Sequence, residues 1–247
     1  MANFNTNQLQ NILPDPNNRI SHAGDILSSN AGTGFGPGFA SFQLTSEQPT
    51  LRNFTNSGRL LARSIVAHKW KVAIKYNKLT QVDFDRIYSF IINRRGALNP
   101  FFVSLPNYRV PRDSSFATYA ASANLQIGSG LAAGSTQALI SKSGFTVSGD
   151  GKPSPGDLFT ISGTNSNHKK AYMVTRVETQ ADYTGTQPSA SQVRIHFTPG
   201  LAKTIATNDD FIFHNPLIQV ITSGDIQQYT LDSNNLYSFS LNLEEIQ

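Results

Sequence analysis

The stretch LTQVDFDRIYSFIINRRG, residues 79–96, is the one long segment of this sequence with the periodicity of an α-helix. Its large apolar side chains recur at intervals of three and four residues, which places on one face Phe84, Ile87, Tyr88 and Ile91. Thr80 is the expected N-cap, and Asp83 completes a pair of the capping-box type. We therefore predict a helix over residues 80–95 whose apolar stripe packs on a sheet.

The helix-like stretch ends in Arg94-Arg95-Gly96. Arginines in the last turn are favoured by the partial negative charge at a helix C-terminus. Gly96 suits the left-handed C′ position, because it has no Cβ to clash there. Chemistry at the end of a helix is therefore sufficient to explain these three residues.

Strand-like segments flank the helix, HKWKVAIKY at 68–76 and NPFFVSL at 99–105. In the first, bulky apolar residues alternate with lysines, which predicts a half-buried strand with a basic outer face. The C-terminal segment LYSFSLNLEEIQ at 236–247 alternates in the same way. We expect this segment to pair with residues 69–76, which would bring Glu244 and Glu245 to the lysine-bearing side.

The order of these patterns predicts a mainly β protein with four parts. Residues 1–41 form an extended N-terminal arm that is ordered only against a partner, because they contain few anchoring apolar groups. Residues 42–110 and 217–247 form one small β-barrel or sandwich with the single flanking helix. Residues 111–216 consist of short strands and Gly, Pro and Asp turns. They predict an inserted, small all-β domain in which no helix is needed.

Composition excludes several classes of protein. The 247 residues include no cysteine, so disulfides and thiolate metal sites are excluded. The N-terminus lacks the basic start and apolar centre of a secretory signal. No apolar run approaches the roughly 20 residues that cross a bilayer. We expect a protein made in a cytosol, with no membrane partner.

Charge is distributed unevenly along the chain. Residues 42–113 contain twelve basic and four acidic residues, whereas residues 217–247 contain four acidic residues and no basic one. An internal or inter-subunit complement between these blocks explains the pattern more simply than nucleic acid, since no nucleic-acid-binding motif is present. The side chains predicted to lie at a subunit interface are Lys69, Lys71, Lys75, Arg94, Arg95, Glu244 and Glu245.

Catalytic patterns are missing from the sequence. The five histidines form no HExxH pair, and there is no GxSxG elbow or phosphate-binding GxxxxGK[ST] loop. His196 and His214 could share a metal only if a hairpin brought them together, and an ordinary surface position is the simpler interpretation. We predict that the protein is not an enzyme and that it uses no cofactor and no metal.

Two segments resemble bacteriophage tail proteins. KWKVAIKYNKLTQVDFDRIYSFIINRRGALNPFFVSLP is similar to tail-tip proteins of the distal tail protein and lambda minor tail protein M type. PGDLFTISGTNSNHKKAYMVTRVETQ, followed by VRIHFTPGLAKTIATNDDFIFHNP, is similar to a β module inserted into many phage tail proteins. The resemblance implies a tail-tip or baseplate ring, usually six-fold, that joins the tail tube to hub or fibre proteins. It also implies that the chain is assembled in the host cytoplasm into the virion tail.

A carbohydrate- or receptor-binding module is the alternative function, since an inserted β domain can face outward and hold a sugar. Such a site would require an exposed platform of aromatic residues. The candidates are Tyr172, Tyr183, Phe197 and Phe211, although alternation places most of them in the core.

Overall fold

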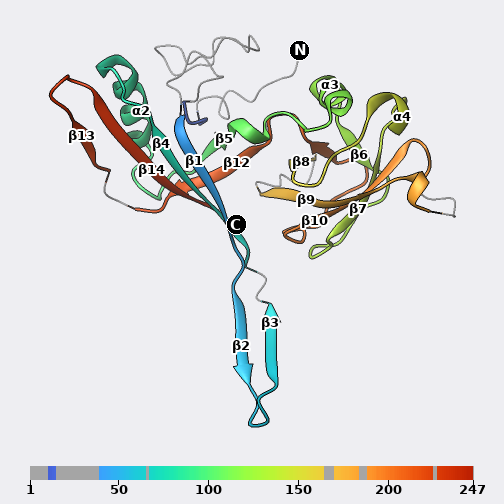
Figure 1. Cartoon of the computed structure of the whole chain (residues 1–247). Coiled ribbons are helices and arrows are strands. Elements are labelled where there is room, and N and C mark those ends of the chain that lie inside the picture. The colour runs from blue at the N-terminus through green and yellow to red at the C-terminus, as the bar shows by residue number, and fades with distance from the viewer. Residues whose placement is uncertain are drawn as a thin grey trace. The chain divides into compact units, whose positions relative to one another are not determined.

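The computed structural model describes residues 11–14, 39–64, 67–163, 170–183, 188–224 and 227–246. These residues form two compact units (Figure 1). The first unit contains the described residues up to Val103 together with Gln219–Ile246, and the second is Ser104–Ile218. The second unit is thus an insertion within the first. The sequence predicted an inserted domain at residues 111–216, so the observed unit begins seven residues earlier and ends two residues later.

The first unit consists of an open six-stranded sheet, one long helix and a two-stranded hairpin. The sheet has the order β1-β4-β14-β12-β5, and β13 also pairs with β14. Its strands are β1 (Phe39–Glu47), β4 (Lys69–Tyr76), β5 (Phe101–Ser104), β12 (Leu217–Thr222), β13 (Tyr229–Leu231) and β14 (Tyr237–Glu245). The helix is α2 (Gln81–Asn93), and the hairpin is formed by β2 (Thr50–Phe54) and β3 (Leu60–Ser64).

Strands β4 and β14 form the centre of this sheet. They pair antiparallel, with Leu241 opposite Ile74 and Leu243 opposite Val72, and all four side chains are buried. The pairing of the C-terminal segment with residues 69–76, which alternation predicted, is confirmed. Sequence segments about 170 residues apart thus contribute to one apolar face.

Helix α2 confirms the predicted apolar stripe, since Phe84, Ile87 and Ile91 are buried. The ring of Phe84 stacks on Tyr237 of β14 with centroids 4.3 Å apart, which fixes the helix on the sheet. The hydroxyl of Thr80 donates to the Asp83 carboxylate at 3.0 Å and makes no capping bond to the backbone.

The C-terminus of α2 differs from the prediction. The helix ends at Asn93, so Arg94 is the C-cap and neither arginine lies in the last turn. Arg95 takes the first left-handed position at φ 55°, and Gly96 follows at φ 66°. Arg94 and Arg95 therefore belong to the turn that leads to β5.

The second unit is built on a closed barrel with the strand order β10-β7-β6-β11-β8-β9. Its strands are β6 (Leu125–Ile127), β7 (Gln137–Ser141), β8 (Leu158–Ser162), β9 (Ala171–Glu178), β10 (Gln192–Thr198) and β11 (Asp210–Ile212). Short helices precede or connect them: η1 (Pro106–Tyr108), α3 (Ser114–Ser122), α4 (Val147–Asp150) and η2 (Gln180–Asp182). Closure pairs every strand of the barrel on both sides.

Helix α3 corrects the expectation that this region needs no helix. The Asp113 carboxylate accepts a hydrogen bond from the Phe116 N–H at 3.0 Å and so caps the helix N-terminus. Phe116 and Ala120 are buried against the barrel core. The helix supplies apolar cover that the short strands alone do not provide.

The interior of the barrel is aromatic. Phe159 lies at its centre, with four buried rings whose centroids are 5.2 to 5.5 Å away. These rings belong to Tyr172, Phe197, Phe211 and Phe213. Aromatic burial of this kind is the main stabilising contribution in a small barrel.

The described part of the N-terminal region corrects another expectation. Residues 11–14 pack on the chain's own sheet, where Leu13 is fully buried. The Phe102 N–H donates to the Asn11 carbonyl at 2.7 Å, and the Leu13 N–H donates to the Phe102 carbonyl at 2.8 Å. These residues therefore need no partner to be ordered. Residues 1–10 and 15–38 of the predicted arm lie outside the described residues.

Candidate assembly surface

The lysines predicted to form an interface lie on the outer face of β4. Lys71 forms an ion pair of 2.9 Å with Glu47 on β1, and this hydrogen-bonded contact raises the pKa of Lys71 and lowers the pKa of Glu47. Lys69 lies 3.6 Å from Glu244 on β14. Both pairs join neighbouring strands diagonally. The basic block and the acidic C-terminus thus meet within one chain.

Glu245 is not on this face. It is completely buried, and its carboxylate accepts a hydrogen bond from the Trp70 N–H at 3.3 Å. Consecutive residues of a strand point to opposite sides, so Glu244 and Glu245 have different environments. Glu244 remains available to an assembly surface, whereas Glu245 stabilises the edge of the first unit's core.

Arg94 is also largely buried. Its guanidinium donates to the Asn11 side-chain oxygen at 2.5 Å and lies over the Phe90 ring, 4.5 Å from the centroid. Burial lowers the pKa of Arg94. The side chain therefore anchors residues 11–14 to the end of α2. Arg95 is exposed. Among the described residues, neither Arg95 nor Lys75 forms an ion pair.

The sheet of the first unit has unequal edges. On one side β5 is covered by residues 11–13, which bridge to Phe102. On that same side β13 pairs only with β14, and its residues Tyr229 and Leu231 are about half exposed. On the opposite side β1 pairs only with β4. Within the described part of the chain, the two open margins of the sheet are therefore β1 and β13.

A shallow depression of about 460 Å³ lies beside β13 and β14. Its lining includes Lys75, Tyr229 and Phe239, together with several amide and hydroxyl side chains, and none of the described residues that line it is a carboxylate or an imidazole. A general acid or base is usually supplied by such groups.

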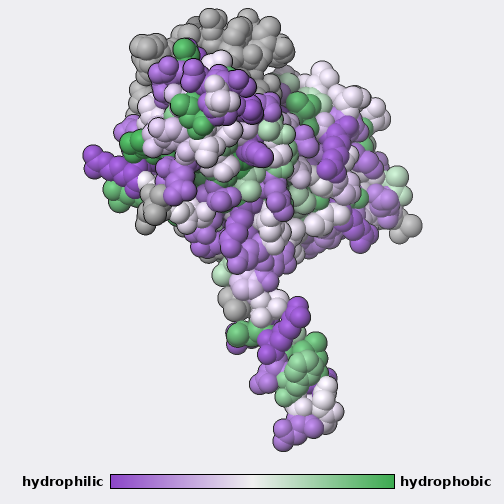
Figure 2. Space-filling model, turned by 60° about the vertical axis from the view of Figure 1, so that its left-hand side comes forward, coloured by the Kyte–Doolittle hydropathy of each residue, from purple (hydrophilic) through white to green (hydrophobic). Residues whose placement is uncertain are grey.

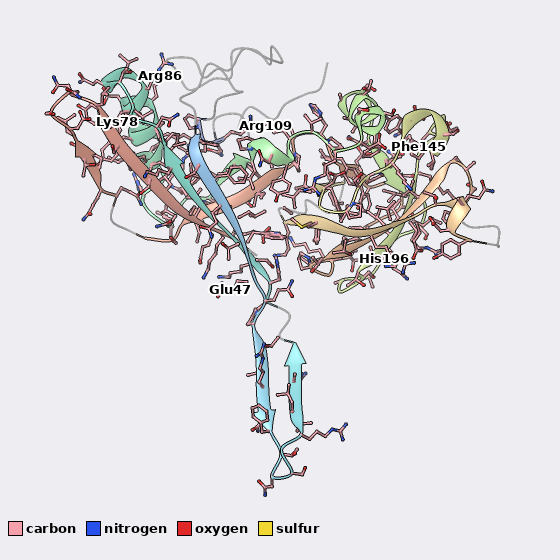
Figure 3. All side chains as sticks on the ribbon, viewed as in Figure 1. Glu47, Lys78, Arg86, Arg109, Phe145 and His196 are labelled. Carbon is pink, nitrogen blue, oxygen red and sulfur yellow. The ribbon has the colours of Figure 1, made fainter. Side chains whose placement is uncertain are left out.

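The inserted barrel contains one cluster of charged side chains that sequence patterns did not reveal. Glu178 on β9 is buried, and its carboxylate lies 2.8 Å from Arg176, 3.1 Å from His196 and 3.7 Å from Arg194. The Tyr183 hydroxyl donates to the same carboxylate and is the main reason that the pKa of Glu178 is lowered. Arg194 also lies over the Tyr183 ring. In Figure 3, His196 marks the position of this cluster.

This cluster is formed by strand register. Arg194 lies opposite Glu178 and His196 lies opposite Arg176 on adjacent strands. Charged residues at alternate positions of two strands could have predicted this cluster from the sequence. That prediction would also have required knowing that the two strands are neighbours. Each member of the cluster contacts another member, so the cluster is an internal network of the barrel and does not require a ligand to account for it.

Two further features bear on function. Among the described residues, no group of three or more His, Asp or Glu side chains is arranged to hold a metal ion. His196 contacts the Glu178 carboxylate. Of the helices in the described ranges, none has both the length and the apolar character needed to cross a membrane.

Comparison with known proteins points to the tails of bacteriophages. The chain is similar to distal tail protein pb9 of Escherichia phage T5, with 27% identity over 215 residues. The aligned region is 85% of this chain and 93% of the phage protein, so it includes both units. No protein-family model matches the chain. The similarity supports a structural protein of the phage tail, and of the two types named in the sequence analysis it supports the distal tail protein alone.

Proposed function

We propose that this chain is a non-enzymatic distal tail protein that forms a ring in the virion tail and connects the tail tube to the hub or fibre proteins. The observation that carries the proposal is the similarity to distal tail protein pb9 over nearly the whole length of both chains. The open margins of the sheet support it independently. An exposed strand edge invites pairing with another chain, and closed symmetry satisfies every such edge.

The positions of β1 and β13 on opposite sides of one sheet support the proposal of a ring. If β1 of one copy pairs with β13 of the next, the contact is head-to-tail, and a rotation that closes produces a ring. The resemblance to tail-tip proteins suggests six copies. Lys69, Lys71 and Lys75 lie on β4 beside β1, and Glu244 lies on β14. Together with the exposed Arg95, these side chains would set register between copies.

Exposed charge pairs contribute little affinity, so apolar contacts must supply most of it. Tyr229, Leu231 and the partly exposed apolar residues of β1 are suited to this role. Charge would then determine which surfaces meet and in which register. We expect assembly in the host cytoplasm and a final location in the tail.

Immunogold labelling of purified virions tests this function. Gold at the distal end of the tail is the expected result, and tail preparations that contain no copies of the chain would contradict it.

The carbohydrate-binding alternative is left with little support. Of its four candidate rings, Tyr172, Phe197 and Phe211 are buried in the barrel. Tyr183 is about one-third exposed, but its hydroxyl binds Glu178 and its face is covered by Arg194. A glycan array screened with the full chain and with Tyr183→Ala tests this alternative.

A further inference from the structure

The hairpin formed by β2 and β3 is unlike the rest of the molecule. Every described side chain from Thr50 to Phe54 is exposed, and the large apolar residues of both strands are exposed by more than half. They are Leu51, Phe54, Leu60 and Leu61. Figure 2 shows hydrophobic surface on this part of the chain. A two-stranded hairpin is only marginally stable alone in water, so such a surface indicates an interaction site.

The register of the hairpin distributes these residues over both faces. Phe54 lies opposite Leu60 on one face, whereas Leu51 lies opposite Arg63 and Leu61 opposite Asn53 on the other. A hairpin that rests on a flat surface needs only one apolar face. Apolar residues on both faces instead fit insertion into a groove that contacts the two faces together.

The hairpin is also cationic. It contains Arg52, Arg59 and Arg63, and no acidic residue occurs between positions 48 and 82. Among the described residues, none of these guanidinium groups takes part in an ion pair. The groove that receives the hairpin should therefore be acidic as well as apolar.

In the described part of the chain, a second copy presents few carboxylates that are free of a partner. Glu47 and Glu244 are already paired with Lys71 and Lys69 of β4, and Asp232 is paired with Lys78. Glu245 binds the backbone, and the described carboxylates of the barrel serve in caps, turns and the Glu178 network. In the described part of the chain, Asp85 is the one acidic residue with no hydrogen bond or ion pair.

We propose that residues 50–64 form an arm that docks into an acidic, apolar groove on a different protein of the tail, and not into a second copy of this chain. This inference rests on the proposed function for the setting in which the partner occurs. The arm and the ring are carried by different surfaces, so each can fail without the other.

Site-specific photo-crosslinking in assembled virions tests the arm. Benzoylphenylalanine is placed at Phe54 or Leu61, and at exposed Ser191 of the barrel as the control. The expected result is a crosslink from both hairpin positions to an acidic peptide of a different tail protein. A crosslink to a second copy would overturn the inference, as would a yield no higher than that of the control.

Charge variants of the full chain give the second test. R52E/R59E/R63E should lower incorporation into tails by about tenfold or more, since like charges would meet in the groove. R52K/R59K/R63K keeps the charge and should retain most of the incorporation. The mass of the purified oligomer should be the same for both variants. Loss of oligomer mass in the glutamate variant alone would show that the arm serves self-association and would refute the proposed partner.

Discussion

Lys69 and Glu244 lie 3.6 Å apart across β4 and β14, although 174 residues separate them in the sequence. The basic and acidic blocks of the chain are therefore complementary within one subunit. Lys71 is similarly paired with Glu47. The surfaces that we propose for a neighbouring copy are the exposed part of these pairs, the strand margins beside them, and Lys75, which forms no ion pair among the described residues.

Reversing charge on this face should prevent assembly while the subunit stays folded. In K71E/K75E, the carboxylate introduced at position 71 would face Glu47, and the outer face of β4 would lose most of its positive charge. Both positions are exposed, so the core is unaffected. Sedimentation velocity should show monomer, with a far-ultraviolet circular dichroism spectrum like that of the unchanged chain. Assembly of this variant at normal strength would remove these lysines from the interface, and K71R/K75R is the matched control.

Removing the Arg94 guanidinium should release residues 11–14 from the sheet. Arg94→Ala loses the bond to Asn11, a charge-assisted hydrogen bond in a largely buried site. We expect a loss of about 2 kcal/mol in the free energy of unfolding, measured by urea titration. Hydrogen exchange at the Phe102 amide, which donates to Asn11, should accelerate. Arg95→Ala changes an exposed neighbour and should alter neither the free energy of unfolding nor the exchange of the Phe102 amide. Equal effects of the two variants would contradict the anchoring role.

Truncating Phe84 should weaken the packing of α2 on the sheet. The ring is buried and contacts Tyr237, Tyr88 and Phe239. Phe84→Ala should cost about 3 kcal/mol or more, the range for removing a buried aromatic side chain. Val82→Ala on the exposed side of the same helix should change stability little. Thermal unfolding followed by calorimetry compares the two, and similar melting points would show that the helix does not cover the core.

The Glu178 network predicts a particular dependence on pH. The Tyr183 hydroxyl, with Arg176 and His196, lowers the pKa of Glu178 below its ordinary value of 4.5. Unfolding releases the carboxyl to that ordinary value, so its stabilising effect is complete above pH 4.5 and is lost as pH falls through the native pKa. Urea midpoints measured from pH 7 down to pH 3 should fall less steeply for Glu178→Gln. Parallel profiles for the two proteins would mean that the carboxylate is not stabilised in its charged form.

Sequence periodicity predicted the parts of this fold in which one element alternates between a buried and an exposed face. β4, β14 and α2 are of this kind, and the lysine side of β4 was placed correctly. The hairpin at 50–64 was not recognised, because apolar residues on both faces of a strand give no alternation. Helix α3 was missed for a related reason: it is nine residues long and rich in Ser and Ala. The capping Asp113 was its available signal.

Only the part of the candidate assembly surface that lies on a single strand could be predicted from the sequence. Lysines 69, 71 and 75 could be placed on one face from alternation, but the burial of Arg94 and Glu245 depends on tertiary contacts. Asn11 reaches Arg94 from 83 positions earlier in the chain, and the Trp70 amide reaches Glu245 across the sheet. Such contacts have no local pattern. The Glu178 network required the register of β9 and β10 in the same way.

The central claim is that the open margins of the sheet are completed by further copies of the same chain in a closed ring. Multi-angle light scattering of the purified full chain, with electron micrographs of the same fraction, tests it most directly. We expect a single mass that is a whole multiple of 27.0 kDa, and annular particles of uniform diameter. A mass of one chain at every protein concentration, with no rings, would contradict the account.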